Sequence, residues 1–312
     1  MEQLPTCQEK NTKMKFDSTV TTAAMENIED SIFALLEREL KYVTKPHFSR
    51  KVSSRNSPVS VLKYRQNDAS AFTFDNESRL LILQWMYEVV DHYSVSREII
   101  PIAMSFFDRY VAKNPIGCYE REQYQLLALT SLYTAIKLHE NNRAGSLDFF
   151  SKLSSKRFSP REIEAMEKKL LNDLDWLMNP PTPQSFVSNF MDLLTATISD
   201  EEVRCALSNI YEVTNYVVEV ALLRSSVQYE NASTLAFASL IVAMRDAKTS
   251  VIPQELYKSV LSNILSFDFA SPDEIAIVAD EVKSSLESGD MHLNMNDVYK
   301  KFDPEGSIYQ LY

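Results

Sequence analysis

Hydrophobic residues recur along this chain at the spacing of α-helices. Five stretches between residues 77 and 177 place apolar side chains three or four positions apart, and five more follow between 184 and 287. This period of about 3.6 residues is that of a helix with one buried face. The pattern predicts helices near 77–93, 97–112, 120–139, 147–154, 160–177, 184–196, 200–224, 229–247, 253–266 and 272–287.

An additional amphipathic helix is predicted near 26–43, ahead of the two groups. Its apolar stripe consists of Ile28, Ile32, Leu35, Leu36, Leu40 and Val43. The serine-rich and basic stretch that follows, 45–70, predicts a loop. Between the two groups, Pro180, Pro181 and Pro183 break the helical pattern and indicate a domain joint.

These features divide the chain into five segments. We expect a flexible tail at 1–24, an N-terminal helix and loop at 25–70, a first helical domain at 71–179, a second at 183–290 and a C-terminal tail at 291–312.

The two groups of helices repeat each other. Residues 127–135 (LALTSLYTA) and 235–243 (LAFASLIVA) share Leu, Ala, Ser, Leu and Ala at a separation of 108. Residues 159–163 (SPREI) match 271–275 (SPDEI) at a separation of 112. Each of the latter begins a helix, with serine as the N-cap, proline at N1 and glutamate reaching back from N3. We infer a tandem duplication of a five-helix bundle, with the third helix of each at its centre.

Composition narrows the possible classes of protein. Hydrophobic residues make up 45% of the 312 residues, which is enough for a sizeable core. Only four glycines are present, so glycine-rich phosphate-binding loops of the Rossmann or P-loop kind are excluded. The net charge of −11 argues against binding to duplex DNA or to acidic membranes.

The cysteines and the termini indicate a reducing compartment. Cys7, Cys118 and Cys205 are too far apart for a zinc knuckle, and their odd number disfavours a disulfide framework. The N-terminus lacks the apolar core of a secretory signal, and no apolar run is long enough for a membrane span. We expect the protein in the nucleus, the cytoplasm or both.

Catalytic motifs are missing from the sequence. His139-Glu140 begins like a zinc-protease motif, but the second histidine is absent, and no GxSxG sequence presents a serine nucleophile. We therefore expect no enzyme activity, no metal site and no cofactor.

Four charged residues lie within apolar helices. Arg79 and Asp108 are predicted to form an internal ion pair between the first two helices of the first group, because an unpaired buried charge costs several kcal/mol. Lys137 and Glu167 leave two interpretations open. They are either solvated helix ends or a polar pair at the rim of a surface that binds another protein.

The helix at 79–90 (RLLILQWMYEVV) is apolar on more than one face. Leu83 and Tyr87 lie on one face, whereas Leu81, Trp85 and Glu88 lie off it. Such a helix is either fully enclosed or offers one face to a ligand, and the residues alone favour enclosure.

Four segments in this order resemble the cyclin box: RLLILQWMYEVV, IPIAMSFFDRYVA, YQLLALTSLYTAIKLHE and EAMEKKLLNDLDW. The resemblance covers residues 77–177, and 184–288 resembles the more divergent second box of the same family. It implies an all-α fold of two tandem five-helix bundles with an extra N-terminal helix.

The resemblance also implies a function and site residues. Cyclins have no catalytic machinery; they activate a cyclin-dependent serine/threonine protein kinase by holding its mobile regulatory helix. Lys137 and Glu167 match the kinase-binding residues, and Arg79 and Asp108 match the family's internal pair. The patch that docks Arg-x-Leu substrates or inhibitors corresponds to Leu81, Ile82, Trp85, Glu88 and Gln125.

The subclass and two alternatives stay open. Ser78, Gln84 and Tyr124 depart from the residues common in the family, which bears on docking specificity. The stretch ALLEREL resembles the N-terminal helix of D-type cyclins, but their LxCxE motif is not present. A cyclin-fold transcription protein that binds DNA predicts a basic second repeat, whereas 184–290 is acidic. A cyclin-like scaffold without a kinase is distinguishable only by a binding experiment.

Overall fold

The computed structural model describes residues 18–42, 76–114, 121–140, 145–196, 198, 200–224, 230–246 and 254–287. Within these residues the chain forms eleven α-helices and no strand. Most of the predicted tails and the predicted loop at 45–70 lie outside the described residues.

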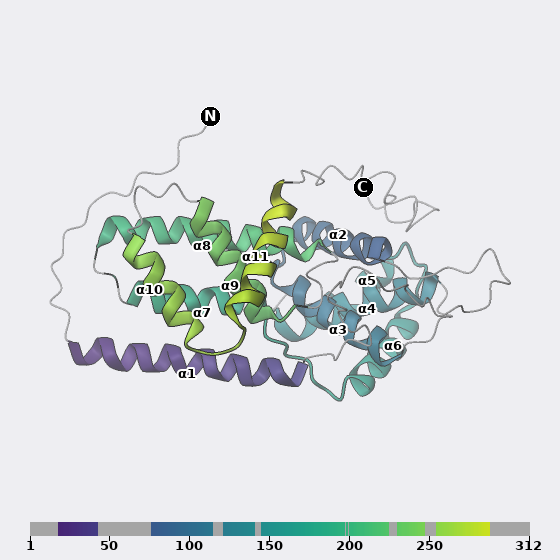
Figure 1. Ribbon diagram of the computed structural model, residues 1–312. Coiled ribbons are helices and arrows are strands. Elements are labelled where there is room, and N and C mark those ends of the chain that lie inside the picture. The colour runs from purple at the N-terminus through teal and green to yellow at the C-terminus, as the bar shows by residue number, and fades with distance from the viewer. Residues whose placement is uncertain are drawn as a thin grey trace, which may run out of the picture.

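The helices form two bundles, the first on the right and the second on the left in Figure 1. The first consists of α2 (Asn76–His92), α3 (Ile99–Lys113), α4 (Arg121–His139), α5 (Leu147–Leu153) and α6 (Pro160–Asp173). The second consists of α7 (Pro183–Ala196), α8 (Glu201–Leu222), α9 (Ala232–Asp246), α10 (Gln254–Leu265) and α11 (Pro272–Glu287). The predicted all-α class and the ten helices are confirmed, although α6 ends earlier than the predicted 177.

The third helix of each bundle lies at its centre. In the first bundle α4 packs against α2, α3 and α6, and in the second α9 packs against α7, α8 and α11. Repeat-related residues occupy the same buried positions, as Leu132 and Leu240 show with no exposed surface. The predicted duplication around a central helix is therefore confirmed by the packing.

The duplicated helix starts have the predicted capping boxes. The Ser159 backbone N–H donates to the Glu162 carboxylate at 2.7 Å, and the Glu162 backbone N–H donates to the Ser159 hydroxyl at 3.3 Å. Ser271 and Glu274 make the same two hydrogen bonds, at 2.9 and 3.3 Å. Both bundles thus begin their last helix by the same local mechanism.

Several helices end in left-handed backbone conformations without a glycine. These positions have φ between 52° and 61°: Ser94, Ser155, Lys156, Asp175, Trp176 and Asp268. Such a conformation costs a residue with a side chain about 1–2 kcal/mol. The pair Asp175 and Trp176 comes just after Leu174, the C-cap of α6, and explains why this helix stops before 177.

Helix α1 (Ser18–Tyr42) runs along α7 of the second bundle (Figure 1). It begins at Ser18, within the segment predicted as a tail, so that prediction placed the helix start too late. Ile32 and Leu35 are buried as predicted, but Leu40 is 77% exposed. The stripe prediction is wrong there because the neighbouring Glu39 takes the buried position, at 7% exposure.

The C-terminal end of α1 connects the two bundles. The Glu39 carboxylate accepts hydrogen bonds from the backbone N–H and the hydroxyl of Ser233, at the start of α9, at 2.9 and 2.6 Å. The Tyr42 hydroxyl accepts from the Asn179 backbone N–H at 3.0 Å. The Arg109 guanidinium of α3 lies 4.8 Å from the centre of the Tyr42 ring. One helix therefore contacts the first bundle, the linker and the second bundle.

Candidate functional site

Lys137, near the end of α4, and Glu167, in the middle of α6, form an ion pair at the surface of the first bundle. The Lys137 ammonium donates to both carboxylate oxygens of Glu167, at 2.9 and 3.0 Å. The Lys137 side chain is 44% exposed and that of Glu167 only 9%. The structure therefore has an ion pair rather than two separately solvated helix ends, and its place at a surface that binds another protein stays a prediction.

The electrostatics of the pair favour the charged lysine. Burial alone lowers the pKa of Lys137, but its hydrogen bonds with Glu167, the nearby Glu167 charge and the adjacent Tyr133 raise it overall. The pair therefore presents a fixed positive charge at neutral pH, on a carboxylate that is mostly enclosed.

Two exposed apolar side chains lie close in the chain to this pair. Leu138, directly after Lys137, is 49% exposed, and Trp176, just after α6, is 68% exposed. A His139 ring nitrogen lies 2.8 Å from the Met178 carbonyl oxygen and so connects the two segments. Leu138 therefore adds exposed apolar area next to Lys137 in the chain.

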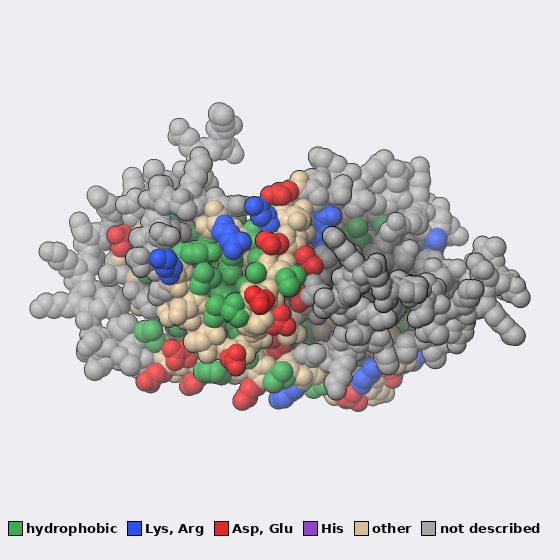
Figure 2. All heavy atoms as spheres, viewed as in Figure 1, with side chains coloured by type: hydrophobic (Ala, Val, Ile, Leu, Met, Phe, Trp, Pro, Cys, Tyr) green, Lys and Arg blue, Asp and Glu red, His purple; other side chains and the backbone are tan. Residues whose placement is uncertain are grey.

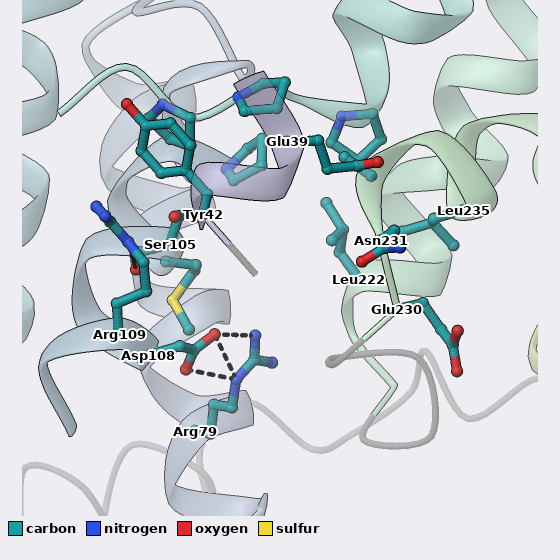
Figure 3. A pocket seen from close by; sticks show the side chains of 16 residues that line it. Glu39, Tyr42, Arg79, Ser105, Asp108, Arg109, Leu222, Glu230, Asn231 and Leu235 are labelled. Atoms are coloured by element: carbon teal, nitrogen blue, oxygen red, sulfur yellow. Dashed lines mark hydrogen bonds and ion pairs between the residues drawn. The ribbon is translucent and has the colours of Figure 1, made fainter. Parts of the chain in front are cut away.

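The predicted pair of Arg79 and Asp108 is present and joins α2 to α3. Arg79 donates to the two Asp108 oxygens at 3.0 and 2.8 Å. The pair lines a cavity of about 170 Å³ between the bundles, together with Glu39 and Tyr42 of α1 (Figure 3). Arg109 also lines it, and burial lowers the pKa of Arg109 to about 10. The cavity therefore lies at the contact between the two bundles, where α1 and the linker also meet.

The implied docking patch on α2 is enclosed. Leu81, Ile82 and Trp85 are 7%, 0% and 5% exposed and belong to the core of the first bundle. Gln125 of α4 is 8% exposed and accepts a hydrogen bond from Arg157 at 2.7 Å. These residues therefore form no open apolar surface in this structure, because α2 is apolar on two faces and both are covered. The structure agrees with the enclosure that the residues alone favour.

Glu88 is the partly exposed member of that set. Burial raises the pKa of Glu88 to about 7. One turn earlier, the indole N–H of Trp85 is buried without a hydrogen-bond partner. The helix thus holds a carboxylate that is only about half ionised at neutral pH and that a cation would stabilise.

Over the described ranges, no three His, Cys, Asp or Glu side chains gather into a group that could hold a metal ion. No helix in the same part of the chain is long and apolar enough to cross a bilayer.

The face of the second bundle in Figure 2 carries acidic side chains along α11. The helix contributes Asp273, Glu274, Asp280, Glu281 and Glu287 against a single lysine, Lys283. This face is not the basic surface that the DNA-binding alternative predicts.

Two residues that shape these sites, Tyr133 and Glu39, were not predicted from the sequence. Tyr133 contacts Lys137, and its position four residues earlier, one helical turn away, is a signal that could have found it. Glu39 was not predicted because it is one of several charged residues in an amphipathic helix, and nothing in the sequence distinguishes it from the others.

Comparisons with known proteins fit this geometry. The family model described as "Cyclin, N-terminal domain" matches residues 32–179. The G1/S-specific cyclin CLN3 of Candida albicans is 27% identical over 55% of this chain, which spans only 38% of that relative. The G1/S-specific cyclin-D1 of Rattus norvegicus is 24% identical, covering 74% of this chain and 75% of the relative.

Two solved structures share the fold. A viral cyclin from herpesvirus saimiri superposes with a TM-score of 0.53 at 19% identity, covering 69% of this chain and 88% of that one. A chain of the CAK complex from Chaetomium thermophilum, bound to ATP-gamma-S, also gives a TM-score of 0.53, at 20% identity, covering 95% of this chain and 83% of that one.

Proposed function

Because this chain belongs to the cyclin family, we propose that it is a regulatory subunit that binds and activates a cyclin-dependent serine/threonine protein kinase and controls cell-cycle progression. It catalyses no reaction itself in this proposal. It works in the nucleus, the cytoplasm or both, which fluorescence microscopy of the tagged chain tests.

The observation that carries the proposal is the ion pair of Lys137 and Glu167 at the surface of the first bundle. The pair joins α4 to α6 within the region that matches the cyclin N-terminal domain. Leu138, 49% exposed, adds apolar area beside it. A charge in a fixed position with apolar surface around it supports a docking face for a folded partner.

The activation mechanism follows from the requirements of phosphoryl transfer. A protein kinase needs its Lys–Glu ion pair and its metal-binding aspartate in place before transfer is efficient. A rigid bundle that fits only the active position of the kinase's regulatory helix shifts that equilibrium by its difference in affinity. Moving a population from about 1% to about 99% active needs roughly 5.5 kcal/mol of such preference. Buried core on both sides of α4 gives the bundle the necessary stiffness.

Docking of Arg-x-Leu peptides is a secondary part of the proposal. Glu88 would accept the arginine, and the free indole N–H of Trp85 would bind the peptide backbone. Leu81 and Trp85 are enclosed, so α2 must be uncovered before the leucine side chain can bind.

The test uses the full chain with purified cyclin-dependent kinases, scored by binding and by phosphorylation of histone. We expect Lys137→Glu and Glu167→Lys each to weaken binding by about 30-fold or more, since a buried interfacial charge is left opposed. Lys283→Glu, on α11 of the second bundle, is the matched control and should bind as wild type.

A double variant separates a surface role from an internal one. Lys137→Glu combined with Glu167→Lys restores the ion pair within the chain but reverses it toward the partner. Folding, followed by circular dichroism, should recover while kinase binding does not. Full recovery of kinase binding, or normal activation by both single variants, would show the proposal to be wrong.

A further inference from the structure

A pocket of about 140 Å³ lies between α3, α4 and α6 of the first bundle. Its lining includes buried groups, namely the rings of Tyr110 and Tyr124 and the side chain of Leu127. Leu126 and Met166, which are both partly exposed, also line it. The pocket is therefore mainly apolar and reaches the surface of the bundle.

The size of the pocket limits what it can hold. An engineered protein cavity of similar volume, lined by Leu, Ile and Phe side chains, binds benzene. Sites for drug-sized ligands measure roughly 300 Å³ or more. The pocket between α3, α4 and α6 therefore has room for one bulky apolar side chain rather than for a drug-sized ligand. One side chain inserted into a pocket is typical of a protein partner that uses a single residue as its anchor.

Lys169 of α6 adds a positive charge to this pocket. Its side chain is exposed and lines the pocket, and its ammonium nitrogen lies 5.5 Å from the centre of the Tyr110 ring. Lys169 makes no ion pair with any residue that the structure describes. Lys168, the residue before it, is already paired, because its ammonium donates to the Glu164 carboxylate at 2.9 Å. The Lys169 ammonium is therefore available to a carboxylate of a partner.

The pocket is separate from the ion pair of Lys137 and Glu167. On α4, Leu127 precedes Lys137 by ten residues, which is about 15 Å along a helix. On α6, Met166 and Lys169 are three positions apart and so share a face of the helix. Glu167 is rotated by about 100° from Met166 around the same helix. A side chain that occupies the pocket therefore does not cover Lys137.

We propose that this pocket docks a short acidic peptide segment of a partner protein other than the kinase. One bulky apolar side chain of the segment enters the pocket, and a neighbouring carboxylate pairs with the Lys169 ammonium. The chain's net charge of −11 opposes this pairing only weakly, because physiological salt screens charges that lie farther apart than about 8 Å. The site goes beyond the proposed function and does not depend on it.

The probe that tests the pocket is a short synthetic peptide with one leucine flanked by glutamates, titrated into the full chain without a kinase. Met166 lines the pocket and so reports binding directly. Its methyl group, labelled with ¹³C and assigned by means of Met166→Leu, should shift in the NMR spectrum during the titration. A peptide with alanine in place of the leucine should bind about tenfold more weakly or worse, because it buries less apolar area.

The variant Lys169→Glu tests the ion pair with the peptide. It replaces an attraction by a repulsion at an exposed site, so the affinity for the glutamate peptide should fall by about three- to tenfold. Lys168→Glu is the matched control, because it changes the net charge equally on the same helix but removes a lysine that is paired with Glu164. It should bind the peptide as the wild type does.

Three results would overturn the proposal: no shift of the Met166 methyl group, equal affinity for the leucine and alanine peptides, or equal affinity of Lys169→Glu and wild type. A shift that depends on the concentration of the chain alone would assign the pocket to a second copy of this chain and would overturn it as well. Because no kinase is present in the titration, a failure of the proposed function leaves these results unaffected.

Discussion

The two bundles have equivalent core positions but differ at the surface. Leu132 and Leu240, at equivalent places in the central helices, are both fully buried. At the same separation, Lys137 of the first bundle corresponds to the exposed Arg245 of the second. Glu167 corresponds to Ala279, which is 1% exposed. The second bundle thus keeps a cation and lacks the carboxylate.

Tyr133, whose ring lies beside the Lys137 ammonium, differs in the same way. Tyr133 corresponds to Ile241, which is 6% exposed and packs in the core of the second bundle. The two repeats therefore have the same buried core positions, whereas the second bundle lacks the ion pair that the first has at its surface. Packing fixes the core of both repeats, whereas the surface of each can change independently.

The largest expected effect tests whether the two cores are equivalent. Leu132→Ala and Leu240→Ala each remove a fully buried side chain, so each should lower the free energy of unfolding by about 2–5 kcal/mol. Urea denaturation followed by circular dichroism measures both, with the exposed Leu40→Ala as a control near zero. A large loss in one bundle and almost none in the other would break the equivalence.

A carboxylate introduced into the second bundle should be poorly tolerated. Ala279→Glu buries a charge in an apolar cluster of α8, α9 and α11, and we expect a loss of about 2–4 kcal/mol in the free energy of unfolding. Glu167→Ala should cost less, because the lysine that it leaves behind is 44% exposed. Thermal unfolding compares the two. Equal stability of Ala279→Glu and wild type would mean that Arg245 can act as Lys137 does.

The ionisation of Glu88 gives the first bundle a pH dependence. Burial raises the pKa of Glu88 to about 7, above its value in the unfolded chain. Its contribution to stability is then full below about pH 4 and is lost as the pH rises through 7. Because the side chain is partly exposed, the change should stay below about 1 kcal/mol.

Denaturation at pH 5, 6, 7 and 8 measures that change. Glu88→Gln should unfold with a flatter pH profile than wild type over this range. An identical profile in the two chains would assign the titration to another group.

The smallest effect is expected at two equivalent serines. Ser131 and Ser239 are both fully buried, and neither hydroxyl has a hydrogen-bond partner in the described structure. Ser131→Ala and Ser239→Ala each remove an unsatisfied polar group and should be neutral or stabilise by up to about 1 kcal/mol. Melting temperatures measure both; a clear decrease in either would reveal a hydrogen bond absent from this structure.

The sequence predicts the helices and the repeat because both depend on patterns of residues that are close together in the chain. Apolar spacing gave all ten bundle helices, and the serine, proline and glutamate at each duplicated start predicted the capping boxes of α6 and α11. The pair of Arg79 and Asp108 was predictable because neither charge could stay buried alone. The pairing of Lys137 with Glu167 was less predictable, because the same sequence is also compatible with two separately solvated helix ends.

Other features depend on contacts that no local pattern contains. The start of α1 at Ser18 lies in a polar stretch without an apolar stripe, so apolar spacing does not predict it. Leu40 was expected in the stripe, but Glu39 occupies the buried position because Ser233 supplies two hydrogen bonds to its carboxylate. Long-range hydrogen bonds of this kind override helical periodicity.

The hydrogen bond between Glu39 and Ser233 has a consequence for biosynthesis. It joins residues 194 positions apart, so α1 leaves the ribosome long before α7 and α9, its docking surface, have been made. The first bundle can fold in that interval, while Ile32 and Leu35 of α1, which are buried in the complete structure, remain exposed to solvent. A nascent chain stalled before α9 should therefore bind chaperones at its N-terminal helix, and release should follow once Ser233 emerges.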